Sequence, residues 1–121
     1  PVFLTSNYRM TKISVEQDLI DAQLDSYLVV VDTDGIGIES ATAGGQFNEH
    51  RIKEALDSTK VLECVHHRII ILPGMAARLR DPLEDLTQLE VWIGPRDSSA
   101  IPDFMKENWK LDAVKAKYID A

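Results

Sequence analysis

The chain has 121 residues, enough for one domain of ordinary size and too few for two. Apolar residues make up 45% of it and charged residues 27%, a normal globular mixture that excludes a disordered or collagen-like chain. Lys and Arg number 13 against 20 Asp and Glu, and the net charge of −7 argues against nucleic acid as a partner, because a nucleic-acid backbone needs a basic stripe. The longest apolar runs, 28–31 and 69–72, are far shorter than the ~18 residues of a membrane span, so we expect no membrane contact.

Cys64 is the single cysteine of the chain. One thiol cannot form an intramolecular disulfide, a Cys-rich zinc site or a four-thiolate iron–sulfur cluster. This usage is compatible with a reducing compartment, and we expect a cytoplasmic location.

Short apolar runs recur along the chain and are rich in Val, Ile and Leu. They occupy residues 2–5, 27–33, 68–72 and 90–93. Runs with little polar alternation indicate strands buried on both faces, and such strands are typical of a parallel sheet covered by helices.

Helical patterns follow each run. The first carries a capping-box spacing at Ser14 and Gln17 and a predicted core stripe of Ile13, Ile20 and Leu24. A short segment at 38–43 precedes the second, which starts at Asn48. The third should be kinked by Pro82, and the fourth has Pro102 in its first turn.

The alternation of strand and helix predicts an α/β fold, a three-layer sandwich with a small parallel sheet of flavodoxin-like or Rossmann-like type. We assign residues 1–109 to this domain and residues 110–121 to a C-terminal tail or terminal helix. In such sheets ligands bind beyond the carboxyl ends of the strands. The turns that meet there offer glycines and neutral hydrogen-bonding groups, which suits holding a large polar cofactor, and no catalytic pair can be assembled.

Several features of these turns have two readings. Asp32 and Asp34 could bind Mg²⁺, but a structural role is favoured because no lysine follows a later strand. Residues 5–7, before a helix, could cradle a phosphate or serve as turn and cap. His66 and His67 precede the third run, so we expect them at the opposite end of the sheet.

Longer segments of the sequence resemble a known family. Residues 27–35 (YLVVVDTDG), 67–74 (HRIIILPG) and 91–97 (VWIGPRD) are similar to the C-terminal corrinoid-binding domain of the large subunit of the corrinoid iron–sulfur protein. That protein is the methyl carrier of the carbon monoxide dehydrogenase/acetyl-CoA synthase system. Residues 4–8 and 43–47 also resemble this family, and the likeness runs in unbroken order from about residue 1 to residue 109.

The resemblance implies a cobalamin or related cobamide, held base-off with no protein histidine on cobalt. In the anaerobic Wood–Ljungdahl (acetyl-CoA) pathway it would carry a methyl group from methyltetrahydrofolate:corrinoid methyltransferase to acetyl-CoA synthase. The implied partners are these two enzymes and the small subunit of the corrinoid iron–sulfur protein. This chain holds no iron–sulfur cluster, and we expect it to be a fragment or subunit that is not catalytic alone.

Loop position and resemblance together nominate the cofactor-binding residues, and no metal ligand or catalytic residue is nominated. The nominated residues are Thr5, Ser6, Asn7, Tyr8, Met10, Thr11, Thr33, Gly35, Ile36, Gly37, Pro73, Gly74, Met75, Ala76, Gly94, Pro95, Arg96, Ser98 and Ala100. Two alternatives stay open. One is a flavin mononucleotide- or nucleotide-binding flavodoxin-like domain that uses residues 5–11 as a phosphate cradle. The other is a cofactor-free interaction domain that docks a partner through residues 109–118.

Overall fold

The structure, a computed structural model, describes residues 1–23 and 26–109. The predicted core residue Leu24 and the predicted tail at 110–121 lie outside these residues. Within the described part, no helix is both long enough and apolar enough to cross a membrane.

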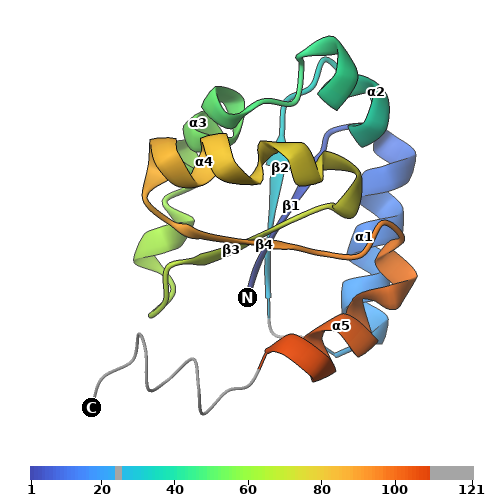
Figure 1. Ribbon diagram of the computed structural model, residues 1–121. Coiled ribbons are helices and arrows are strands. Elements are labelled where there is room, and N and C mark those ends of the chain that lie inside the picture. Colours follow the sequence, from blue (N-terminus) through green and yellow to red (C-terminus); the bar gives the residue numbers. More distant parts are fainter. Residues whose placement is uncertain (24–25, 110–121) are drawn as a thin grey trace.

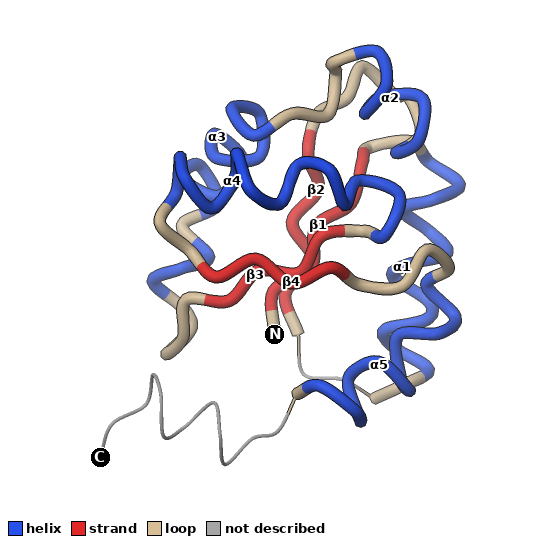
Figure 2. Tube along the Cα trace, viewed as in Figure 1, coloured by secondary structure: helices blue, strands red, loops and turns tan. Residues whose placement is uncertain are grey.

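The core of the fold is a four-stranded sheet in which every paired strand runs parallel to its neighbour. The strands are β1 (Val2–Ser6), β2 (Tyr27–Val31), β3 (Ile69–Leu72) and β4 (Glu90–Ile93), in the order β2-β1-β3-β4. The chain therefore moves from β1 to one edge and then crosses back to β3 on the other side of β1 (Figure 2). The point where this direction reverses, between β1 and β3, is where open parallel sheets bind ligands.

Helices cover both faces of the sheet (Figure 1). The α1 (Arg9–Asp21) and α5 (Ile101–Asn108) helices pack on one face, around Phe3 and Ile71. On the other face lie α2 (Ile38–Gly44), α3 (Glu49–Thr59) and α4 (Arg80–Thr87). Short 3₁₀ turns complete the connections: η1 (Val61–Glu63), η2 (Gly74–Leu79) and η3 (Ser98–Ala100). The predicted three-layer α/β sandwich with a parallel sheet is confirmed.

The predicted core stripe of the first helix is wrong. Ile13 and Ile20 are 52% and 67% exposed, whereas Leu19 is buried and Val15 packs beside it. Apolar residues occupy both sides of this helix, so helical spacing alone allowed either side to face the core. Leu19 packs against the Phe3 side of the sheet, and this contact selects the buried side. The helix also begins at Arg9, ahead of the predicted capping box.

The predicted kink at Pro82 is also wrong. The break lies earlier, inside η2, where Ala76 has non-helical dihedral angles (φ −108°, ψ 21°). Pro82 sits inside the first turn of α4. A proline is tolerated at this position because the first amides of a helix have no intrahelical acceptor.

Candidate ligand-binding site

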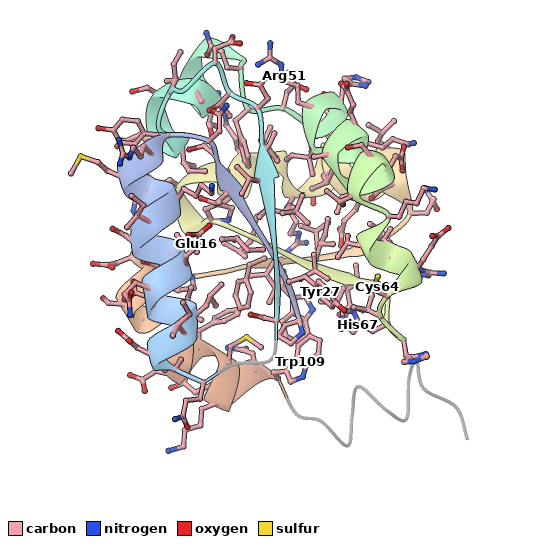
Figure 3. All side chains as sticks on the ribbon, turned by 180° about the vertical axis from the view of Figure 1, so that it is seen from behind. Glu16, Tyr27, Arg51, Cys64, His67 and Trp109 are labelled. Carbon is pink, nitrogen blue, oxygen red and sulfur yellow. The ribbon has the colours of Figure 1, made fainter. Side chains whose placement is uncertain are left out.

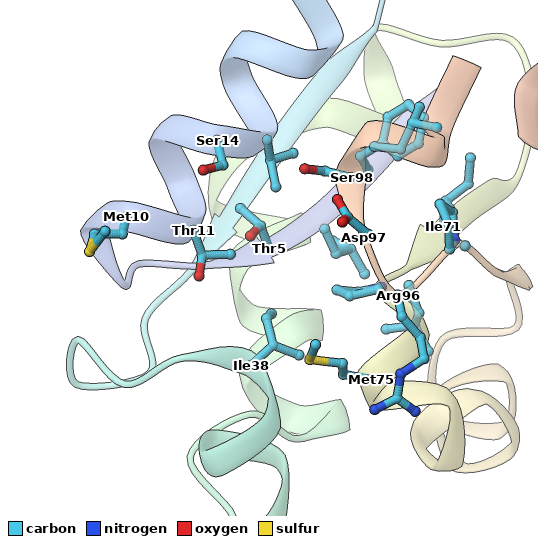
Figure 4. Close-up of a pocket in the computed structure, with 18 residues that line it drawn as sticks. Thr5, Met10, Thr11, Ser14, Ile38, Ile71, Met75, Arg96, Asp97 and Ser98 are labelled. Carbon is cyan, nitrogen blue, oxygen red and sulfur yellow. The ribbon is translucent and has the colours of Figure 1, made fainter. Parts of the chain in front are cut away.

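A cavity of about 440 Å³ opens at the carboxyl ends of β1, β3 and β4 (Figure 4). It lies at the reversal of strand order, between the first turns of α1 and the loops that follow β3 and β4. This is the end of the sheet at which the sequence predicted a ligand. The nominated residues that line the cavity are Thr5, Met10, Thr11, Pro73, Met75, Gly94, Pro95, Arg96 and Ser98.

The remaining nominated residues do not line this cavity but lie on the loops that follow the four strands or at the ends of these loops. They are Ser6, Asn7, Tyr8, Thr33, Gly35, Ile36, Gly37, Gly74, Ala76 and Ala100. Lining residues that were not nominated are Phe3, Leu4, Ser14, Val15, Ile38, Ile71, Leu72, Asp97 and Ile101. Most of these are apolar strand and helix residues, which a search for polar loop groups passes over. Ser14 follows Thr11 by three residues on a helix, and this spacing could have revealed it.

The cavity has an apolar floor, and hydroxyl groups stand on its sides. Phe3, Ile71 and Ile101 belong to the core beneath α1 and α5 and form part of the floor. Hydroxyl groups surround it, from Thr5 and Thr11 on one side and Ser98 on the other (Figure 4). A cavity of this kind binds the apolar body of a ligand and orients its polar groups.

Large apolar side chains stand exposed at the same end of the sheet. Tyr8, Met10 and Met75 are 40%, 69% and 39% exposed. Met10 and Met75 line the cavity, and the Tyr8 hydroxyl lies 3.8 Å from the Met10 sulfur. This apolar rim, defined as Tyr8, Met10 and Met75, offers a surface for the flat face of a ligand larger than the cavity.

Asn7 ties the loop after β1 to the loop after β2. Its Oδ1 accepts hydrogen bonds from Thr33 N (3.1 Å) and Gly35 N (2.9 Å) and lies 3.0 Å from Thr33 Oγ1. Its Nδ2 donates to Asp32 Oδ1 at 3.0 Å. The side chain therefore holds the second loop in shape, and Thr33 Oγ1 extends the network by donating to Ile36 O at 2.6 Å.

The two aspartates of the second loop have structural partners. Asp32 Oδ1 also accepts from Asp34 N at 2.9 Å, and this backbone bond, followed by the Asn7 amide, lowers the pKa of Asp32. Asp34 pairs with Arg51 at 3.5 Å. In the described part of the chain no group of three His, Cys, Asp or Glu residues is placed to hold a metal ion. The contacts support the structural reading of this loop.

The loops after β3 and β4 are in close contact. A Cβ atom on Gly74 would lie 2.8 Å from both Arg96 N and Gly94 O, so only glycine fits there without a backbone shift. Gly74 N also donates to Pro95 O at 3.2 Å. The glycine of the third loop therefore permits packing between two walls of the site.

The fourth loop is anchored at two points. Ser98 Oγ donates to Asp18 Oδ2, which ties the loop to α1. Asp97 Oδ1 accepts from Ser99 N at 2.9 Å, and the backbone and side-chain hydrogen bonds from Ser99 lower the pKa of Asp97. The carboxylate of Asp97 thus caps η3 while also lining the cavity.

His67 lies at the other end of the sheet, as predicted. Figure 3 shows it near Trp109 and Tyr27, far from Arg51. Its ring contacts the Trp109 ring edge-on at 5.0 Å, and its Nδ1 accepts from Ile69 N at 3.1 Å. Burial is the main cause that lowers the pKa of His67 to about 4, so the ring is neutral near pH 7. No histidine lines the cavity described above.

Comparison with known proteins gives the family and the relatives of the chain. Residues 1–105 match the family described as CO dehydrogenase/acetyl-CoA synthase delta subunit. The acetyl-CoA decarbonylase/synthase complex subunit gamma of Archaeoglobus fulgidus is 42% identical over 109 residues, which is 90% of this chain and 23% of the relative. The gamma subunit of Methanosarcina acetivorans is 42% identical over 111 residues, covering 90% and 24%. That of Methanopyrus kandleri is 38% identical over 111 residues, covering 92% and 24%.

The chain thus spans about a quarter of the length of these curated relatives. The relatives named here are gamma subunits, whereas the family description names the delta subunit. The link to the carbon monoxide dehydrogenase/acetyl-CoA synthase system, predicted from the sequence, is confirmed. The chain belongs to the CO dehydrogenase/acetyl-CoA synthase delta subunit family.

Proposed function

We propose that this chain is a corrinoid-binding module of a methyl carrier in the acetyl-CoA decarbonylase/synthase system. The observation that carries the proposal is the cavity at the reversal of strand order. It has an apolar floor, hydroxyl groups on its sides, and the apolar rim of Tyr8, Met10 and Met75 beside it. The match to gamma subunits of acetyl-CoA decarbonylase/synthase complexes supports the pathway. A corrinoid supplies, when bound, a cobalt centre that can accept and release a methyl group.

The residues of the site fit a corrinoid in two ways. A corrin ring is too wide for a cavity of about 440 Å³, so the cavity takes one arm of the cofactor and the ring lies across the loops. The apolar rim then covers part of the ring face. Amide side chains of the ring need hydrogen-bonding groups, and Thr11 and the loop backbone provide them.

The positions of the histidines support a base-off cofactor without a protein ligand on cobalt. Among the described residues, His67 is buried against Trp109 at the far end of the sheet, His66 precedes it there, and His50 belongs to the outer helix α3. None of the three lines the cavity.

The exposed rim supports a role for partner proteins. A ring that lies on Tyr8, Met10 and Met75 leaves its other face open, and that face needs a second protein to exclude water. We assign this role to the small subunit of the corrinoid iron–sulfur protein. The methyltransferase and acetyl-CoA synthase would approach the same open face in turn.

An ultraviolet–visible titration tests the proposal. The purified chain is titrated with hydroxocobalamin and cob(II)alamin and, separately, with flavin mononucleotide. A saturable change to a base-off corrinoid spectrum is expected. Flavin binding without corrinoid binding would replace the proposal with the flavodoxin-like alternative. A chain that binds neither, even when the small subunit is added, would overturn the corrinoid assignment.

A pair of variants on one helix locates the site. Ser14→Trp places a large side chain at the cavity mouth, and we expect it to weaken corrinoid binding at least about tenfold by occluding the space. Gln17→Trp, three residues further along α1 and outside the cavity lining, is the matched control and should bind as wild type does. Equal affinities for the two variants would show that the cofactor binds elsewhere.

A further inference from the structure

The outer side of α1 carries a row of apolar side chains that the described part of the chain leaves uncovered. Met10, Ile13 and Ile20 are 69%, 52% and 67% exposed, whereas Leu19, on the opposite side of the helix, is buried against the sheet. Together with the exposed Gln17, the three apolar residues are spaced by three, four and three positions, which places them along one side of a helix. These four residues are here called the outer stripe. Figure 1 shows α1 along one side of the molecule, where a partner can reach it.

The spacing of the outer stripe indicates a helix as its partner. Isolated apolar residues on a surface need no partner, but a continuous row of them marks an interaction site. Positions that alternate by three and four residues form the seam at which two helices interlock their side chains. Gln17 lies within this seam, and its Nε2 donates to Asp21 Oδ1 at 2.8 Å. A single polar residue in an apolar seam fixes how two helices align, so the outer stripe suits one defined partner helix.

The charges of α1 run against its helix dipole. Every other α-helix in the described ranges has an acidic residue in its first turn, namely Glu39 in α2, Glu49 in α3, Asp81 in α4 and Asp103 in α5. The first turn of α1 has no acidic residue, and its last turn has no basic one. Instead, Arg9 and Lys12 lie in its first half, and its second half carries Glu16, Asp18 and Asp21. This order destabilises a helix on its own, because the dipole is positive at the N-terminus, and an oppositely charged partner offsets that loss.

A second copy of α1, running in the opposite direction, complements both features. The outer stripe is symmetric about its midpoint, so an antiparallel pair sets Met10 opposite Ile20 of the second copy and Ile13 opposite its Gln17. The same pairing places the basic first half of each helix beside the acidic second half of the other. A parallel pair would instead place like charges together. A surface that is complementary to itself in this way is what a twofold dimer requires.

We propose that two copies of this chain associate through their outer stripes, with the α1 helices antiparallel about a twofold axis. Met10 also lines the cavity, and it lies at the N-terminal end of the outer stripe. The two cavities therefore lie at opposite ends of the helix pair. The contact requires no cofactor, so it is tested on the chain alone and stands or falls independently of the proposed function.

Analytical ultracentrifugation of the purified chain over a range of concentrations tests the association. A reversible monomer–dimer equilibrium is expected. Ile13→Glu and Ile20→Glu should each raise the dimer dissociation constant at least about a hundredfold, because a twofold contact loses the apolar side chain twice and gains charges in the seam. Tyr27→Glu is the matched control: Tyr27 is 45% exposed but lies on β2, and its substitution should leave the dissociation constant unchanged. Circular dichroism checks that each variant keeps the fold.

Cross-linking between copies tests the direction of the helices. In a Cys64→Ser background, which removes the exposed native thiol, Arg9→Cys and Asp21→Cys are prepared separately and then mixed. Under mild oxidation, disulfides should form between the two variants and not within either variant alone. Cross-links within one variant alone would show parallel helices and overturn the proposed arrangement. A chain that stays monomeric at every concentration, or a dimer that tolerates both Ile13→Glu and Ile20→Glu, would overturn the outer stripe as a contact between copies.

Discussion

Replacement of Asn7 by alanine tests whether one side chain holds the second loop of the site. The Asn7 side chain makes two hydrogen bonds through Oδ1 and one through Nδ2, all to residues 25 to 28 positions later in the sequence. Its removal takes away every side-chain bond between the loop after β1 and the segment at Asp32, Thr33 and Gly35. We expect Asn7→Ala to destabilise the fold and to loosen this loop.

The environment of each bond sets the size of the loss. Thr33 is fully buried, so removal of Asn7 leaves its backbone amide without a partner, at a loss of about 1–3 kcal/mol. The bonds to Asp32 and Gly35 are exposed, and water replaces them. Thr33 Oγ1 keeps its bond to Ile36 O, which limits the damage. The expected decrease in the free energy of unfolding is therefore about 1–3 kcal/mol.

Urea denaturation measures the decrease, and the pKa of Asp32, followed by NMR, reports the local contact. In wild type the Asp34 amide and then the Asn7 amide lower this pKa, so Asn7→Ala should raise it toward the ordinary value. Asn48→Ala is the control, because Asn48 caps α3 and makes no contact with Asp32. It should cost about 1 kcal/mol and leave the pKa of Asp32 unchanged. A loss below about 0.5 kcal/mol in Asn7→Ala, or an unmoved pKa, would refute the reasoning.

Three further outcomes are expected. Without ligand, Thr5→Val should raise the melting temperature by roughly 4–8 °C, because a buried hydroxyl without a hydrogen-bond partner destabilises the fold by about 1 kcal/mol. A lower melting temperature would show that the Thr5 hydroxyl has a partner. Wild type should lose roughly 1–3 kcal/mol of stability as pH falls from 6.5 to about 4, because His67 takes up a proton at a higher pH in the unfolded chain than in the fold. His67→Gln should reduce this dependence of stability on pH, and His66→Gln should leave it unchanged. Gly74→Ala should lower the free energy of unfolding by roughly 1–3 kcal/mol in chemical denaturation, because its Cβ would meet backbone atoms at 2.8 Å. Gly37→Ala, whose nearest new contact is a ring atom at 3.6 Å, should lower it less. Equal losses for the two variants would contradict this view of the third loop.

The sheet could be predicted because its strands leave few choices. Runs such as 69–72, with four consecutive buried apolar residues, fit only a strand covered on both sides. The second strand ends at Val31, two residues earlier than predicted, because Thr33 is bound to Asn7 and Ile36 and cannot continue the strand. Long-range contacts of this kind leave no mark in local sequence.

The face of α1 could not be predicted for a related reason. Ile13 and Ile20 form as regular a stripe as Val15 and Leu19 do, and only the packing against Phe3 decides between them. The same uncertainty affects the site, since the rotation of α1 determines that Thr11 and Ser14 face the cavity. Turn residues pointed to the end of the sheet at which the cavity lies, but the apolar floor of the cavity came from strands that had been assigned to the core alone.

Polar groups at the ligand end fall into two classes, and the division indicates what the ligand contacts. The side chains of Asn7, Asp97 and Ser98 make hydrogen bonds within the fold, and those bonds fix the loops in place. The Thr5 hydroxyl and the first amides of α1 make none. Groups that stabilise the loops are not free to stabilise a ligand, so the nominated residues do not contribute equally. Binding should therefore be sensitive to Thr5 at little cost to the fold, whereas loss of Asn7 should weaken the fold first and binding only through it.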